Sequence, residues 1–318
     1  MTQKVLITPR TFGTIDSKPI KLLRDQDYEL IFNPHGRLLT EEELINLISD
    51  VVGVIVGLDP MTAKVLNSAK KLKIISKYGV GVDNIAVDCA TQKKIMVTNT
   101  PGANSLAVAE LTFGLILDVA RQITFSDRRL RQNQWGKCYG FELNGKTLGL
   151  IGTGRIGREV AVRAKGFGMR IIGYDLKPDL EWARTVGVAY MSLDRLLSSA
   201  DIISLHVPLA EGTYHLISSR ELALMKRSAI LINTARGGIV DEDALFQALH
   251  NKEIAGAGLD VYENEPSADS LLRSLDNVVL TSHIGSHTFE SISRMGWMAA
   301  ENLVAGLSGK RPPYLLNP

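Results

Sequence analysis

Apolar residues along the chain fall into short β-branched runs that alternate with stretches of helical spacing. In the first hundred residues the predicted strands are 4–8, 29–32, 53–56, 74–77 and 95–98. The predicted helices between them are 41–49, 63–68 and 84–92. Alternation of this kind is typical of βα units whose parallel sheet is buried on both faces. The pattern therefore predicts an α/β fold.

A second alternating series begins at residue 146. Its predicted strands are 147–151, 169–174, 202–205, 230–233, 256–259 and 278–280. Its predicted helices include 156–167, 193–198, 220–224 and 242–249. Six strands with intervening helices are what a doubly wound dinucleotide-binding fold requires.

Two further helical patterns lie outside these series. Residues 104–131 are apolar over much of the helix circumference, so this helix must pack against a sheet, with or without a second subunit. Residues 288–307 follow the completed second series, and we expect that helix to return to the first.

Composition narrows the class of protein. A length of 318 residues suits two domains, and a net charge of +2 provides no bulk field for nucleic acid or an anionic membrane. Two cysteines, Cys89 and Cys138, argue against a disulfide scaffold or a cysteine-rich metal site, and no metal is expected. The N-terminal apolar run is too short for a signal peptide, and no stretch reaches the length of a membrane span. We therefore expect a soluble cytoplasmic protein.

A glycine fingerprint gives the strongest local signal. Gly152, Gly154 and Gly157 form a GxGxxG pattern that follows an apolar strand and opens a helix. These glycines permit a tight turn, a close approach to a pyrophosphate and close packing of helix on strand, respectively. Asp175 ends the next strand, where a carboxylate accepts hydrogen bonds from a ribose 2′-hydroxyl and repels a 2′-phosphate. The pattern predicts NAD rather than NADP, although Lys177 nearby softens that repulsion.

Three segments that carry candidate catalytic residues also follow strands, at the edge where open α/β sheets bind ligands. They begin at Asn233, Leu259 and Thr281 and contain Arg236, Glu265 and His283, with Glu263 as a competing carboxylate. Taken singly, each side chain has an ordinary structural explanation. Together they suit hydride transfer to a 2-oxo acid. Arginine binds a carboxylate and polarises a carbonyl, histidine transfers the proton, and a carboxylate orients the histidine and favours its charged form.

At this point the chain resembles the D-isomer-specific 2-hydroxyacid dehydrogenases, and most closely their D-3-phosphoglycerate dehydrogenase branch. The matching segments span nearly the whole chain and include Lys77–Asn84, Asn99–Thr112, Leu143–Gly149, the glycine fingerprint, His206–Leu209, Thr234–Gly238, Glu265–Pro266 and His283–Ser286. The resemblance implies a flavodoxin-like substrate-binding domain, 1–101 plus 286–318, and a Rossmann NAD-binding domain, 102–285. The substrate-binding domain is discontinuous, and its final helix returns to the N-terminal unit across a cleft. The resemblance also implies a homodimer formed by the helix after Asn104 and the segment around Trp135.

The same resemblance implies roles for individual residues. Arg236 would bind and polarise the substrate, His283 would be the acid/base, and Glu265 would be its partner. The positions implied for NAD are Val80, Gly152, Gly154, Arg155, Ile156, Gly157, Asp175, His206, Val207, Pro208, Thr213, Thr234, Ala235, Asp260, Gly285 and Ser286. The positions implied for the substrate are Lys77, Gly79, Val80, Gly81, Asn104 and Lys137, the last supplied by the partner subunit.

The chain departs from phosphoglycerate dehydrogenases where they commonly carry an arginine after the third strand, because it reads Val56-Gly57-Leu58 there. Phosphate binding would then depend on Lys77 and Lys137, each a point charge rather than a bidentate fork. His287 stands where relatives carry a small residue, either influencing substrate choice or facing the last helix. The chain stops at Pro318, so a C-terminal small-molecule-sensing domain is not expected.

Three hypotheses follow. The first is NAD-dependent oxidation of D-3-phosphoglycerate, the entry to serine synthesis. The second is the same chemistry on another acid, as in a glyoxylate or hydroxypyruvate reductase or a phosphonate-analogue dehydrogenase. The third is a NAD-sensing, corepressor-like binding protein.

Overall fold

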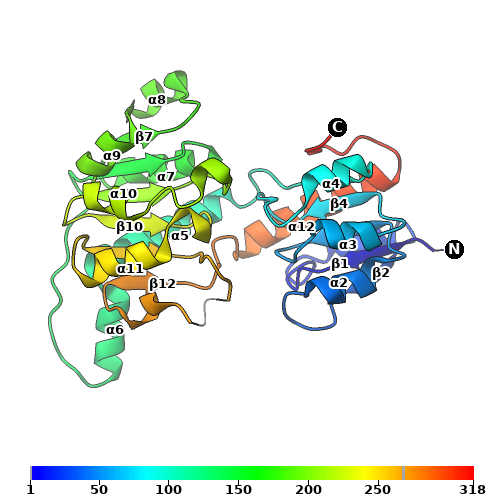
Figure 1. Cartoon of the computed structure of the whole chain (residues 1–318), viewed down its shortest axis with the longest axis horizontal. Helices are drawn as coiled ribbons and strands as arrows, with labels where there is room; N and C mark the ends of the chain where they lie inside the picture. Colours follow the sequence, from blue (N-terminus) through cyan, green and yellow to red (C-terminus); the bar gives the residue numbers. More distant parts are fainter. Residues whose placement is uncertain (1, 267–268) are drawn as a thin grey trace. The chain divides into compact units, whose positions relative to one another are not determined.

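The computed structural model describes residues 2–266 and 269–318, which form two compact units. Unit 1 comprises Met1–Asn104 and Ser286–Pro318, and unit 2 comprises Ser105–Gly285. The first crossing between them follows Asn104 rather than residue 101. Each unit is a parallel sheet covered by helices (Figure 1), so the α/β prediction with two parallel-sheet domains is confirmed.

Unit 1 has a five-stranded parallel sheet in the order β2-β1-β3-β4-β5. The strands are β1 (Lys4–Ile7), β2 (Glu29–Phe32), β3 (Gly53–Val56), β4 (Ile74–Lys77) and β5 (Met96–Thr98). The helices are α1 (Lys18–Arg24), α2 (Glu41–Ile48), α3 (Ala63–Ser68), α4 (Val87–Gln92) and α12 (Phe289–Leu307). The pattern of apolar residues did not predict α1.

Alternate residues along the strands of unit 1 are buried in two separate hydrophobic cores, one on each face of the sheet. Leu6 and Val54 pack with α2, α3 and α4, whereas Val5 and Ile55 pack with α1 and α12. This alternation is what a sheet covered on both faces requires. The last helix of the chain thus completes the first unit, as its position after the second series suggested.

Unit 2 has a seven-stranded parallel sheet in the order β12-β11-β10-β9-β6-β7-β8. Its strands are β6 (Thr147–Ile151), β7 (Arg170–Tyr174), β8 (Val188–Tyr190), β9 (Ile202–Leu205), β10 (Ile230–Asn233), β11 (Gly256–Leu259) and β12 (Val278–Leu280). Its helices are α5 (Ser105–Arg121), α6 (Ile123–Arg131), α7 (Arg155–Gly166), α8 (Leu180–Val186), α9 (Leu193–Ser199), α10 (Ser219–Leu224) and α11 (Glu242–His250), with short 3₁₀ turns η1 (Glu211–Thr213), η2 (Gly237–Ile239) and η3 (Leu271–Ser274). The three-residue edge strand β8 and the short α8 before it were not predicted.

The single helix predicted over 104–131 is two helices. Gln122 has a left-handed backbone with φ 53°, and the Asp118 carboxylate accepts hydrogen bonds from the backbone N–H and hydroxyl of Thr124. The chain therefore turns after α5, which is largely buried, into α6, which buries none of its residues. Hydrophobic spacing does not register a one-residue break of this kind. Within the described residues, no helix is long and apolar enough to cross a membrane.

Candidate active site

The glycine turn after β6 is shaped by close backbone contacts. A Cβ at Gly152 would lie 2.6 Å from the His206 carbonyl oxygen, and one at Gly157 would lie 2.3 Å from the Gly152 carbonyl oxygen. Gly152 also has φ +92°, a conformation that favours glycine. A Cβ at Gly154 would meet open space. Gly154 caps α7 without a side-chain hydrogen bond, leaving room for a phosphate above the first turn of this helix.

His206, which follows β9, packs against this turn. The His206 ring is hydrogen-bonded to the Ser204 hydroxyl at 2.9 Å, and burial lowers its pKa to about 3. The ring is therefore neutral and contributes no positive charge to the cofactor site. Thr213 closes the following turn by donating to the Pro208 carbonyl at 2.6 Å and accepting from the Ala210 N–H at 2.8 Å.

Asp175 lies just after β7, and its carboxylate is held by the glycine turn. It accepts from the Thr153 N–H and hydroxyl at 2.8 and 3.0 Å, and from the Lys177 N–H at 2.9 Å. Burial raises the pKa of Asp175, but these hydrogen bonds outweigh burial and bring the pKa below its ordinary value. The carboxylate is therefore ionised at neutral pH.

Arg236 begins a tight turn after β10. The Asn233 side chain shapes this turn, donating to the Arg236 carbonyl at 2.8 Å and accepting from the Ala235 N–H at 3.0 Å. The Arg236 guanidinium itself donates to the Ala235 carbonyl at 2.7 Å. Below the turn, Thr234 is buried with its hydroxyl 2.9 Å from that of Thr112 on α5. The residues predicted here thus occupy a braced loop at the carboxyl end of the sheet.

Asp260, buried at the end of β11, organises the segment that carries His283. Its carboxylate accepts from the Thr281 hydroxyl at 2.6 Å and from the N–H groups of Ile284 and Gly285 at 2.8 Å each. Its carbonyl accepts from the His283 N–H at 2.9 Å. These bonds hold His283 in a left-handed backbone conformation with φ 54°.

His283 pairs with Glu265 and not with Glu263. The His283 Nδ1 lies 2.7 Å from the Glu265 Oε2, and each side chain is 26% exposed. Glu263 is instead bonded to the Nε2 of His215, at 2.8 Å. Since its Nδ1 is used by a carboxylate, His283 has Nε2 left for a reacting atom, the arrangement expected of an oriented acid/base.

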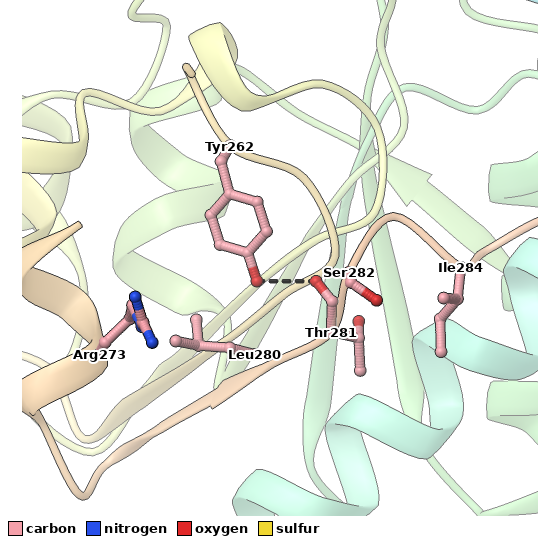
Figure 2. A pocket seen from close by; sticks show the side chains of 6 residues that line it. All are labelled: Tyr262, Arg273, Leu280, Thr281, Ser282 and Ile284. Carbon is pink, nitrogen blue, oxygen red and sulfur yellow. Dashed lines mark hydrogen bonds between the residues drawn. The ribbon is translucent and has the colours of Figure 1, made fainter. Parts of the chain in front are cut away.

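A cavity of about 420 Å³ lies against the same segment (Figure 2). It is lined by Tyr262, Arg273, Leu280, Thr281, Ser282 and Ile284. Figure 2 shows the Tyr262 hydroxyl directed at Thr281, to whose carbonyl it donates at 2.7 Å, with Arg273 and Ile284 on opposite sides. The bond ties the loop before Glu265 to the segment before His283.

In unit 1, the loop from Gly79 to Gly81 follows β4. Two of its carbonyls are bound, since Gly79 accepts from the Thr100 N–H at 2.9 Å and Val80 from the Asn99 side chain at 2.8 Å. Its three N–H groups have no partner among the described residues, so they are available to an anion. The Asn104 Oδ1 is likewise buried without a hydrogen bond in the described part of the chain.

The Lys77 ammonium, just before this loop, is buried rather than exposed to a ligand. The residue is 3% exposed, and its ammonium donates to the Gly57 carbonyl at 2.5 Å and the Asn84 side chain at 2.7 Å. The structure therefore gives Lys77 the role of an internal brace, which disfavours the predicted contact with a phosphate. Lys137 lies on the exposed segment after α6, and His287 is exposed before α12.

Tyr190, on β8, is a residue of this site that the sequence analysis missed. Its hydroxyl lies 2.7 Å from the Thr153 hydroxyl, which in turn donates to Asp175. No signal in the sequence marks it, because β8 is too short to read as a strand and lies at the sheet edge.

Comparisons with known proteins bear on this site. Residues 113–285 match the family model described as D-isomer specific 2-hydroxyacid dehydrogenase, NAD binding domain. A glyoxylate reductase of Korarchaeum cryptofilum is 47% identical over 266 residues, covering 81% of this chain and 80% of that protein.

Two further proteins are similar over most of the chain. A D-3-phosphoglycerate dehydrogenase of Methanocaldococcus jannaschii is 46% identical over 283 residues, which are 88% of this chain but 54% of that protein. The crystal structure of a glyoxylate reductase from Paecilomyes thermophila superposes with a TM-score of 0.87 at 32% identity, covering 99% of this chain and 98% of that one.

Proposed function

Because the chain belongs to the D-isomer specific 2-hydroxyacid dehydrogenase family and is an NAD-dependent oxidoreductase, we propose that it reduces a small unphosphorylated 2-oxo acid. Glyoxylate and hydroxypyruvate are the substrates that we favour. This replaces the first hypothesis, oxidation of D-3-phosphoglycerate, with the second. The similarity to a glyoxylate reductase over four-fifths of both chains supports the change.

The observation that carries the proposal is that the Lys77 ammonium, just before the Gly79–Gly81 loop, is buried and hydrogen-bonded. Lys77 is enclosed and bonded to Gly57 and Asn84, so exposing it to a phosphate would break these hydrogen bonds. Leu58, where an arginine was sought, is 40% exposed and apolar. A substrate phosphate carries close to two negative charges at neutral pH and requires cations or strong donors in return.

The glycine turn and Asp175 fit NAD. The open space above Gly154 and the first turn of α7 suit the pyrophosphate, and the ionised Asp175 suits a ribose with a free 2′-hydroxyl. When bound in the reduced form, this cofactor supplies the hydride. His206 supports the turn as a neutral ring, and Asp260 holds the adjoining segment through Thr281, Ile284 and Gly285.

The remaining chemistry belongs to three side chains. Arg236 binds the substrate carboxylate and polarises the carbonyl at C2. His283 delivers a proton from Nε2 to the carbonyl oxygen as it gains negative charge. Glu265, 2.7 Å from Nδ1, orients the ring and stabilises its protonated form before transfer. In unit 1, the N–H groups of Gly79, Val80 and Gly81 are the donors that we propose for the substrate.

The test is a substrate panel with purified protein and NADH. We expect kcat/KM to be highest for glyoxylate or hydroxypyruvate and at least about tenfold lower for phosphohydroxypyruvate, because the Lys77 ammonium is enclosed and Leu58 is apolar. Pyruvate and 2-oxoglutarate complete the panel. Phosphohydroxypyruvate outrunning hydroxypyruvate would refute the proposal, and no turnover of any acid would favour the NAD-sensing alternative.

A Leu58→Arg variant sharpens this panel. Leu58 is exposed enough to accept the longer side chain, and a guanidinium there adds a phosphate partner of the kind that phosphoglycerate dehydrogenases carry. The ratio of kcat/KM for phosphohydroxypyruvate to that for hydroxypyruvate should rise about tenfold or more, since one charge-assisted hydrogen bond contributes roughly 1.5–3 kcal/mol. Leu271→Arg, at an exposed leucine on η3, is the control and should leave the ratio unchanged.

We also propose that two copies of the chain associate. Trp135 and Tyr139, on the segment after α6, are 87% and 88% exposed, and α6 adds the exposed Ile123 and Leu130. Large apolar side chains gathered on one projecting segment mark an interaction surface. Sedimentation equilibrium should give twice the chain mass, and a Trp135→Ser, Tyr139→Ser double variant should shift it towards the single chain. A wild-type protein of single-chain mass at micromolar concentration would contradict this.

A further inference from the structure

The loop from Tyr262 to Glu265 positions the carboxylate that faces His283. The Glu265 carboxylate is hydrogen-bonded to the His283 ring at 2.7 Å and to the Tyr262 N–H at 3.1 Å. Tyr262 is buried and anchored through its hydroxyl to Thr281 (Figure 2). Glu265 is therefore placed largely by how firmly this loop is held upstream of it.

Glu263, between those two residues, attaches the loop to α11. The Glu263 N–H donates to the Glu242 carboxylate at 2.6 Å, while the Glu242 N–H lies 3.3 Å from the Glu263 carboxylate. Burial raises the pKa of Glu242, the Glu263 N–H opposes this, and the neighbouring Glu263 charge adds to the rise. The two carboxylates therefore lie close together, and a further donor to Glu263 offsets their repulsion.

His215 supplies that donor. Its Nε2 lies 2.8 Å from the Glu263 Oε1 and its Nδ1 3.9 Å from the Asp241 Oδ2, so the ring is flanked by carboxylates from α11's start and from the loop. The ring also stacks on Tyr214 with centroids 4.0 Å apart. His215 has φ 49°, and such a conformation in a residue other than glycine persists where the surroundings impose it.

The same loop touches the turn that carries Arg236. A Cβ at Gly237 would lie 1.8 Å from the Tyr262 carbonyl carbon, so the two loops are in direct backbone contact. The His215 N–H donates to the Gly238 carbonyl at 2.8 Å. His215 therefore contacts both the turn after β10 and, through Glu263, the loop after β11. Nothing in the proposed reaction uses it.

We propose that His215 is a positioning residue: by holding Glu263 it sets the loop from Tyr262 to Glu265, and so the place of the Glu265 carboxylate against His283. The inference rests on the proposed function, because its effect is measured through proton transfer by His283. It assigns His215 no contact with substrate or cofactor.

The test compares His215→Phe with wild type. Phenylalanine keeps an aromatic ring on Tyr214 and removes both the hydrogen bond to Glu263 and the weaker contact with Asp241. Small displacements of a catalytic group lower rates by up to about 10²-fold, so we expect kcat for the reduction to fall about 10- to 100-fold with the Kd for NADH within about twofold. The pH profile of kcat is recorded for each variant, because moving a carboxylate beside the ring that transfers the proton changes that profile, whereas a loss of stability alone does not.

His215→Gln and a double variant distinguish positioning from simple destabilisation. Glutamine restores an N–H donor of similar reach and should recover most of kcat and the wild-type pH profile. Adding Glu263→Gln to His215→Phe should cost less than the product of the two single effects, because both act through one contact. A thermal melt of each variant reports folding separately.

The outcomes separate the two proposals. If wild type reduces none of the acids, the proposed function fails. If wild type is active but His215→Phe retains kcat within twofold and the wild-type pH profile, the positioning role is refuted. A fall in thermal stability alone, with kinetics and pH profile unchanged, also refutes it.

Discussion

Replacing His283 by asparagine is expected to lower kcat for reduction of the 2-oxo acid by about 10³-fold, because a positioned proton donor contributes about 10²- to 10⁴-fold. Asparagine is preferred to alanine here because His283 has φ 54°, a conformation that asparagine tolerates. The variant then removes the acid without straining the backbone. Steady-state kinetics with NADH in excess measure the effect.

Binding of the cofactor should survive this change. The Kd for NADH, from fluorescence titration, should stay within about threefold, because the glycine turn and Asp175 are untouched. His250→Asn is the matched control, an exposed histidine on α11 that stacks on Phe246, and its kcat should match wild type. An unchanged kcat in His283→Asn would remove His283 from the acid/base role.

Arg236 should show the second large effect. A guanidinium that grips a carboxylate with two charge-assisted hydrogen bonds contributes roughly 1.5–3 kcal/mol for each. Arg236→Gln should therefore lower kcat/KM by about 10²- to 10⁴-fold, and Arg236→Lys should recover only part of it, because lysine keeps the charge but not the fork. The order wild type, lysine, glutamine is the diagnostic result.

Two control measurements test whether the loss of activity comes from the Arg236 side chain itself. The Kd for NADH should be little changed in both variants, and the matched control Arg227→Lys, an exposed arginine that bonds the Lys252 carbonyl, should leave kcat/KM unaltered. Equal kcat/KM in Arg236→Lys and wild type would mean that charge alone suffices and that no bidentate grip exists.

Sequence reasoning predicted the parallel sheets because β-branched runs with helical spacing between them recur through both halves of the chain. It missed α1, α8 and β8, which are short and carry little periodicity, and it joined α5 to α6. The break at Gln122 depends on one left-handed residue and the Asp118 carboxylate, and neither alters the hydrophobic spacing.

The candidate site was predictable where a motif demands a particular residue. The close approaches at Gly152 and Gly157 follow from the fingerprint, since no other side chain fits. The contacts of Lys77 were not predictable in this way. Its charge suggested an anion site, whereas the folded chain encloses its ammonium between Gly57 and Asn84. No sequence pattern links either residue to Lys77.

The sequence by itself determined the two parallel sheets, the glycine turn, Asp175 and the presence of Arg236, Glu265 and His283 after strands, because periodicity and glycine geometry are local properties. The family resemblance assigned Glu265 to His283, but only the tertiary structure gives the physical reason why Glu263 does not take that place. Glu263 and Glu265 are equally acidic in the sequence, but His215 and α11 take Glu263, leaving Glu265 at 2.7 Å from the ring. Such a choice depends on distances between segments far apart in the chain, and these exist only once the loops have packed.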